Sequence, residues 1–575
     1  MKKFFSNIKV NSLCFFSKHN FICALSVSFV FLCFFLLFFY PCFDTNDDNF
    51  MIAILNSAYG SSSEQAVYIN HLFARLIIAL QSRFTFICWY SLFLFASTFL
   101  SMVATNYTLI KLFKSSPMQW IILFTINVFC GYEFYVYPQF TKTAGLCTIA
   151  GFLLINLFII TSTLSPIVLL LGIFLMLSGS LWRFSGFGMT CIALSALGFT
   201  HCYYLIKEKK HRSLFKYVLT FLITMISIMS INKISLYISK PNEDWLAYQK
   251  CNSLRAELLD FGFPDYNVNK ELYSDLNISL SDLDLYKNWN FADPNIFNLS
   301  SMQKLVSAKE NTNYIPLSFS SILYAFKEIV NNNILCYIFL LCIVLFLWNY
   351  PYKSIVCHLL CIVAYLFVEL YLIYIQRYGV PRTEVPFVFA IGITLLASTA
   401  FEASTGHPGT SKQFYPHKHL HNILSIICIS LAFSPLLFLN SKTINKEIQA
   451  QNNALFQYIA ENKQCLFLVE DYTHDDIWTK TYGVFTPPTA NCADNYYVLG
   501  GWTYQSPITN QILENYNVQN PFKDVVDAPS IYYINNSNID NDAIIKYIQR
   551  HYSPTAYPVL VKKIGQNHIY KIYSH

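Results

Sequence analysis

The sequence predicts a mainly α-helical, polytopic membrane protein with a small α/β domain at its C-terminus. Of the 575 residues, 54% are hydrophobic and only 13% are charged, whereas soluble proteins carry roughly 25% charged residues. Mean hydropathy is +0.38, and apolar stretches long enough to cross a bilayer recur along the chain. Beyond the last of these stretches, strand-like and helix-like runs alternate to the C-terminus.

The first 440 residues form the predicted transmembrane domain, with about eleven membrane spans. The first span follows several lysines, and no small-residue cleavage site comes after it, which favours an uncleaved helix over a signal peptide. The predicted spans are 21–42, 86–105, 118–136, 145–163, 166–181, 185–206, 217–238, 334–350, 355–375, 384–401 and 422–440.

Basic residues between the spans orient the protein in an inner or plasma membrane. The positive-inside rule places the N-terminus and the loop Lys207–Arg212 in the cytoplasm. Eleven spans then leave the C-terminus outside the cell. Although the net charge is +6, we expect no nucleic-acid partner, because the basic residues are spread between spans instead of forming one face.

Three polar segments then lie on the outer side. The loop 43–85 predicts two short helices along the membrane interface, separated at Gly60. Segment 240–333 predicts a compact, solvated helical insertion. The domain 441–575 predicts strands at 465–470, 496–501, 530–535, 558–564 and 568–573, with helices at 506–516 and 541–552.

The seventeen cysteines lie mostly singly inside apolar spans, where Cys behaves as a small hydrophobe. None of them shows the spacing of zinc ligands. A disulfide between Cys465 and Cys492 is possible if their domain is extracytoplasmic.

An acidic cluster follows the first span directly: Asp44, Asp47 and Asp48. Ionised carboxylates cannot lie in hydrocarbon, so they must face water or a wet cavity. Such groups can serve as general base on a hydroxyl group, or hold a divalent cation. Helix capping is the alternative, but it explains one aspartate and not three.

Basic residues at other span ends fall on the same outer side and predict a site for a lipid phosphate. Arginine is suited to bidentate phosphate binding, while snorkelling to interfacial lipids is the alternative role. The predicted phosphate-binding residues are Arg183, Arg377, Arg382 and Lys142.

Taken together, these motifs resemble the GT-C superfamily of membrane glycosyltransferases, and more closely bacterial membrane proteins of GT-C type. The resemblance spans nearly the whole chain. It is carried by DTNDD after the first span and by the Gly-centred turn and Glu-containing helix of NDDNFMIAILNSAYGSSSEQAVYINHLFARLIIAL. QFTKTA, ISLSDLDLYKNWNFAD, RYGVPR and YYVLGGWTYQSP complete it.

The resemblance implies an enzyme of the bacterial cell envelope, an inverting hexosyl- or pentosyltransferase. It would move a sugar from a polyprenyl-phosphate donor to an envelope glycan or lipid on the outer face, with membrane lipid as a further partner. Asp47 or Asp48 would be the acid/base residue. The family's Asp-Glu pair is Asp-Asp here, so no cofactor is predicted and a divalent cation stays open.

Two other functions stay open at this point. A transporter or flippase for a lipid-linked glycan should have charged residues near the centres of its spans. Its sequence should also show internal repeats related by symmetry. A glycan polymerase would also use arginines of the outer loops. The gathering of charges at one face favours the enzyme over the transporter.

Overall fold

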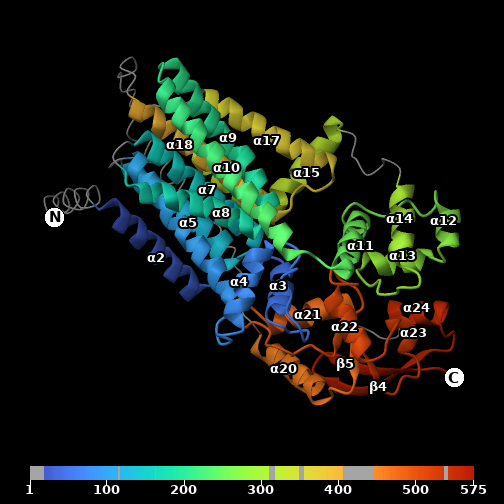
Figure 1. Ribbon diagram of the computed structural model, residues 1–575. Coiled ribbons are helices and arrows are strands. Elements are labelled where there is room, and N and C mark those ends of the chain that lie inside the picture. The colour runs from blue at the N-terminus through green and yellow to red at the C-terminus, as the bar shows by residue number, and fades with distance from the viewer. Residues whose placement is uncertain are drawn as a thin grey trace.

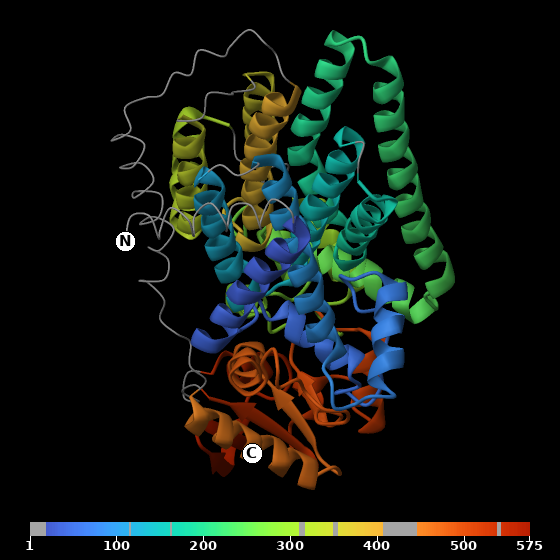
Figure 2. The ribbon, with the colours of Figure 1, turned by 90° about the vertical axis from the view of Figure 1, so that its left-hand side faces the viewer.

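The computed structural model describes residues 19–113, 117–161, 164–309, 317–348, 355–405, 445–536 and 542–575. It has two parts: a bundle of long apolar helices, and a mixed α/β part against one end of that bundle (Figures 1 and 2). The predicted fold class, a mainly helical membrane bundle with a small C-terminal sheet, is confirmed. The chain is an integral membrane protein.

The bundle is built around α7, in which nearly every residue is buried. Its neighbour α8 comes very close, since a Cβ on Gly151 would lie 2.5 Å from the carbonyl oxygen of Gly172. Small residues allow such approach of helix backbones in membranes. The bundle elements are α2 (Asn20–Phe38), α5 (Trp89–Phe113), α6 (Pro117–Cys130), the π-helix η1 (Gly131–Val136), α7 (Phe140–Ile160), α8 (Pro166–Trp182), α9 (Phe184–Lys207), α10 (His211–Ser239), α16 (Ile334–Trp348), α17 (Ile355–Tyr374) and α18 (Pro381–Thr405).

Helices occupy the predicted spans from 21–42 to 384–401, while the predicted span 422–440 lies outside the described residues. Within the described residues, six helices are long and apolar enough to cross a membrane alone, or seven if α15 (Phe319–Asn332) and α16 count as one span bent by 93°. The total of eleven is therefore not confirmed. Two predicted spans are short or irregular, because α8 has 17 residues and α6 continues as a π-helix.

All five strands predicted in the C-terminal segment are present and form one sheet of order β2-β1-β3-β5-β4. Strand β1 (Leu466–Val469) is parallel to β2 (Tyr496–Val498) and β3 (Ile531–Asn535), whereas β5 (Asn567–Tyr573) is antiparallel to β3 and to β4 (Tyr557–Ile564). The helices of this segment are α20 (Lys446–Glu461), α21 (Asp471–Thr481), α22 (Pro507–Asn515), α23 (Pro521–Asp524) and α24 (Ala543–His551).

The insertion after α10 is helical, as predicted, but it shares its core with the C-terminal segment. Tyr286 and Tyr547 join the two segments with a hydroxyl contact of 3.1 Å, and Tyr547 donates to Asp293 at 2.8 Å. One continuous apolar core runs through the insertion, the first outer loop and the α/β segment. The insertion helices are α11 (Glu243–Asp260), α12 (Lys270–Asp275), α13 (Leu280–Lys287) and α14 (Leu299–Ala308).

The first outer loop forms the two predicted helices, α3 (Asp47–Leu55) and α4 (His71–Gln81). We expected both to lie along an interface with one polar face, but α3 is buried from Asp48 to its end. The reason is its position between the bundle and the α/β segment, where the Phe50 ring packs 4.9 Å from His474 and 6.5 Å from Trp478. Burial of α3 therefore comes from chain that is more than 400 residues distant in sequence.

The cysteines Cys465 and Cys492 are both free thiols. The bridge that the sequence left open is thus not formed.

Candidate functional site

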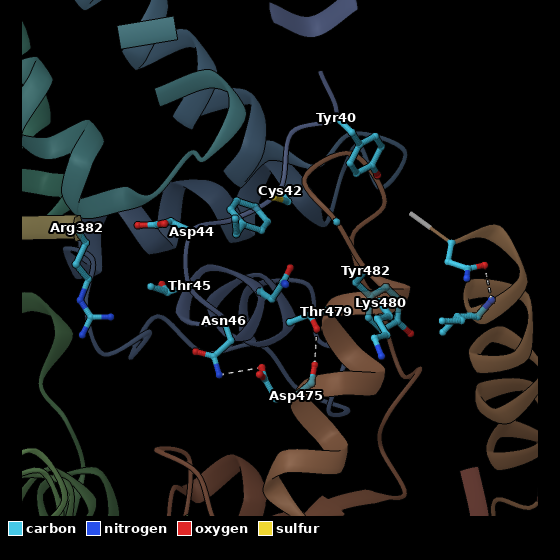
Figure 3. A pocket seen from close by; sticks show the side chains of 15 residues that line it. Tyr40, Cys42, Asp44, Thr45, Asn46, Arg382, Asp475, Thr479, Lys480 and Tyr482 are labelled. Carbon is cyan, nitrogen blue, oxygen red and sulfur yellow. Dashed lines mark hydrogen bonds between the residues drawn. The ribbon is translucent and has the colours of Figure 1, made fainter. Parts of the chain in front are cut away.

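A cavity of about 710 Å³ lies where the first outer loop, the start of α18 and helices α20 and α21 meet (Figure 3). Its lining combines carboxylates, amides and hydroxyls with tyrosine rings, which is the mixture that a pocket for a small polar molecule needs. Asp44 and Asp475 face it from opposite walls, and Arg382 closes one end. The other residues used below are Tyr40, Asn46, Thr479 and Tyr482.

The cavity is held together across the two parts of the molecule. Asn46 donates a hydrogen bond of 3.0 Å to the carboxylate of Asp475 on α21. Helix α21 starts directly after the parallel strand β1, so its first residues lie at the carboxyl edge of the sheet, where ligands of open α/β sheets bind.

Asp44 lines the cavity but is paired with a buried cation. Lys142 Nζ lies 3.3 Å from Asp44 Oδ2 and 2.9 Å from Glu133 Oε2, and the Lys142 side chain is 1% exposed. Two carboxylates neutralise this ammonium group, and burial keeps it from a phosphate in the cavity. Lys142 thus already has two carboxylate partners, and its predicted contact with a phosphate stays a prediction.

Asp48 is fully buried. Its Oδ1 accepts hydrogen bonds from the Tyr90 hydroxyl at 2.7 Å and from the Phe140 backbone N–H at 3.2 Å. Burial raises the pKa of Asp48 well above its ordinary value, while the Tyr90 hydrogen bond opposes the rise. These two hydrogen bonds tie the first outer loop to α5 and α7, and a catalytic role for the buried Asp48 stays a prediction.

Asp47 differs from Asp48 because its side chain is partly exposed and lies beside an arginine. Its Oδ2 lies 3.4 Å from Arg382 Nη1, and the two side chains are 13% and 30% exposed. Burial raises the pKa of Asp47, and the charges of Arg382 and Arg183 oppose that rise. Asp47 is thus an ionisable carboxyl group that keeps some contact with solvent and is surrounded by cations.

Two other predicted arginines lie close to this pair. Arg183 donates to the hydroxyls of Thr141 and Ser185 at 3.2 and 3.1 Å, and its guanidinium lies 5.2 Å from the Tyr68 ring. No carboxylate pairs with Arg183 among the residues that the structure describes. Arg377 forms an ion pair with Asp260 at the end of α11. The structure therefore brings Arg377 and Arg382 within electrostatic reach of Arg183.

Sequence reasoning missed Arg255, Tyr68 and Asp475. Arg255 lies in an insertion that we interpreted as solvated, yet it is 4% exposed. The signal was present in the sequence, because Arg255 falls on the apolar stripe of its helix together with Tyr248, Cys251 and Leu258.

Acidic residues also gather at the start of α21. Burial raises the pKa of Asp471 to about 8, with Asp475 and Glu470 adding to the rise. Over the described ranges, no group of three His, Cys, Asp or Glu side chains is placed to hold a metal ion. Asp471 is therefore a carboxyl group that can bind and release a proton near neutral pH.

No protein-family model matches the sequence, and no curated protein matches it. Comparison with solved structures finds similarity to ArnT from Cupriavidus metallidurans in the apo state, with 9% identity, a TM-score of 0.37, and coverage of 96% of this chain and 97% of that chain. The crystal structure of the same protein bound to undecaprenyl phosphate gives 10% identity and a TM-score of 0.36 at the same coverage. At these identities and TM-scores the similarity establishes neither a shared family nor a shared activity.

Proposed function

We propose that this protein is a membrane glycosyltransferase of GT-C type that moves a sugar from a polyprenyl-phosphate donor to an envelope glycan or lipid. The observation that carries the proposal is the position of Asp47, a carboxylate at the end of the first span, next to Arg382 and near Arg183. The resemblance of the first outer loop to the GT-C acidic motif supports the same reaction. Transfer would take place on the outer face of the cell membrane.

In this proposal Asp47 is the general base. It would accept the proton of an acceptor hydroxyl while the hydroxyl oxygen attacks the anomeric carbon of the donor sugar. The bond between that carbon and the phosphate oxygen breaks, and polyprenyl phosphate leaves with the bonding electron pair. The raised pKa of Asp47 makes it a stronger base than an exposed aspartate, and the nearby arginines favour its ionised form.

The arginines would hold the donor phosphate. Arg183 and Arg382 lie near Asp47, and Arg377 lies near Arg183. A leaving phosphate gains negative charge during the reaction, so fixed guanidinium groups stabilise the transition state more than the bound donor. Arg183 is best suited, because it forms no ion pair with a carboxylate of the described residues and donates only to hydroxyl groups.

The cavity would take the acceptor. Asp44, Asn46 and Asp475 offer hydrogen-bond acceptors and donors for sugar hydroxyls, and the rings of Tyr40 and Tyr482 offer apolar faces. This arrangement gives the C-terminal segment a role, because α21 forms one wall of the cavity (Figure 3).

The test is transfer of labelled sugar from a polyprenyl-phosphate donor by purified protein. Asp47→Asn keeps the size of the side chain and removes the proton acceptor, so we expect a loss of ~10²–10⁴-fold in rate. The matched control is Asp284→Asn, since Asp284 is an exposed aspartate of the insertion.

A normal rate in Asp47→Asn at normal expression would remove Asp47 from the base role. No transfer by the wild-type protein, combined with movement of the intact lipid-linked sugar across vesicles, would favour the transporter instead.

A further inference from the structure

Arg255 on α11 is a buried cation that forms no ion pair with the residues that the structure describes. Its Nε and Nη2 both donate to the amide oxygen of Asn252, and Nη1 has no hydrogen-bond partner. No carboxylate lies within ion-pair distance of Arg255 among the described residues. A guanidinium that is 4% exposed is costly to leave unpaired, so an anion from outside the chain would satisfy it.

The surroundings of Arg255 hold it in one orientation. Its guanidinium lies 5.0 Å from the Trp289 ring, and the Trp289 carbonyl accepts a hydrogen bond from Gly501 at 3.2 Å. Two turns earlier on α11, the Tyr248 hydroxyl donates to the Trp502 carbonyl at 2.7 Å. The insertion is therefore pinned to the α/β segment on both sides of Arg255.

The charge around Asp47 also points to an anionic ligand. Burial raises the pKa of Tyr68 to about 12, and the charges of Arg255, Arg183 and Arg382 all oppose the rise. Those arginines come from α11, the α8–α9 junction and α18, and all of them act on Asp47 as well. Asp47 forms its ion pair with Arg382, whereas Arg183 and Arg255 form no ion pair among the described residues.

We propose that Arg255 binds the phosphate group of the lipid substrate together with Arg183, and so makes the 240–333 insertion part of the donor site. This inference rests on the proposed function. Two uncompensated guanidinium groups match a phosphate monoester dianion better than the monoanionic diester of the sugar-loaded donor. Arg255 thus stabilises the leaving polyprenyl phosphate as its second negative charge develops.

The test measures binding of polyprenyl phosphate to the purified full-length protein in detergent. Arg255→Gln should weaken binding by about 10- to 100-fold, because a charge-assisted contact to a buried group is lost. Arg255→Lys should restore part of it. The control is Arg75→Gln on α4, since Arg75 is an exposed arginine paired with Glu64 in the loop before that helix.

Unchanged affinity in Arg255→Gln would overturn the role of Arg255 and leave the proposed function standing. Failure of the wild-type protein to bind polyprenyl phosphate would overturn both. We expect no binding of polyprenol without phosphate and at least 100-fold weaker binding of inorganic phosphate, and equal binding of either would contradict a lipid-phosphate site.

A second measurement uses the wild-type protein alone, in case Arg255→Gln does not fold. Hydrogen–deuterium exchange should show slower exchange in α11 when polyprenyl phosphate is added, together with slower exchange near Arg183. In steady-state transfer, Arg255→Lys should lower kcat by a larger factor than it raises KM for the donor. Unchanged exchange in α11 would count against the proposal.

Discussion

Three aspartates lie within five residues in the first outer loop, and burial gives each a different role. Asp44 faces the cavity and pairs with Lys142, whereas Asp48 accepts hydrogen bonds inside the protein. Asp47 lies between these environments, with Arg382 as its partner. Their order in the sequence does not distinguish them; the neighbours that reach each carboxylate do.

A prediction at this scale concerns Asp471, whose pKa burial raises from 3.8 to about 8. Folding raises this pKa, so the stability contributed by the group is complete below about pH 4 and is lost as pH rises through 8. Asp471→Asn removes the titrating group. Its midpoint of thermal unfolding, relative to wild type, should therefore rise between pH 4 and 8 and level off above.

The change should approach 1.4 kcal/mol per pH unit at most, since one proton is involved. Scanning fluorimetry of both proteins over this pH range measures it, and the exposed-site variant Asp284→Asn should track the wild type. Parallel profiles for Asp471→Asn and wild type would show that Asp471 titrates normally.

At the scale of elements, close backbone contact joins the insertion to the C-terminal segment. Residues Asn290 and Gly500 form an antiparallel bridge, and the N–H groups of Phe291 and Ala292 both donate to Leu499 at 3.0 Å. A Cβ on Gly500 would lie 1.6 Å from the Trp289 carbonyl oxygen. Only glycine allows this approach of the two backbones. The same contact holds Trp289 in place, and its ring lies 5.0 Å from the Arg255 guanidinium.

We therefore expect Gly500→Ala to destabilise the protein by about 1–3 kcal/mol, as in other cases of overpacking. The control is Gly188→Ala on α9, where an added Cβ meets nothing within 4 Å and alanine favours the helix. Unfolding midpoints in detergent compare the two variants. Equal midpoints would mean that the contact can shift without cost.

At the scale of the whole molecule, the insertion and the α/β segment lie together at one end of the bundle (Figure 1). The cavity lies where the α/β segment meets the first outer loop. If that end is outside, Lys304→Cys and Glu514→Cys should react with a membrane-impermeant maleimide in intact cells, since both positions are exposed. Arg212→Cys, at the opposite predicted side, should react only after permeabilisation. The reverse pattern would place the site in the cytoplasm and remove an outer-face donor.

Local patterns were sufficient to predict most elements of this protein. Apolar length located the membrane helices from α2 to α18, and short apolar runs located all five strands of the sheet. Both signals depend only on residues within one element. Predictions made from them therefore do not depend on how the rest of the chain folds. The acidic loop and the arginines at span ends were also visible in sequence, because charges beside hydrocarbon must lie at a surface or a cavity.

Tertiary structure alone decided which of these residues are exposed and which are buried. Asp48 and Lys142 looked as available as Asp47 and Arg183 until α5, α7 and the π-helix covered them. Arg255 looked solvated until the C-terminal segment packed on its helix, and α3 looked amphipathic until Trp478 and Phe50 met. In each case the covering surface comes from distant sequence, and burial, which sets charge and pKa, depends on that surface and not on the local pattern.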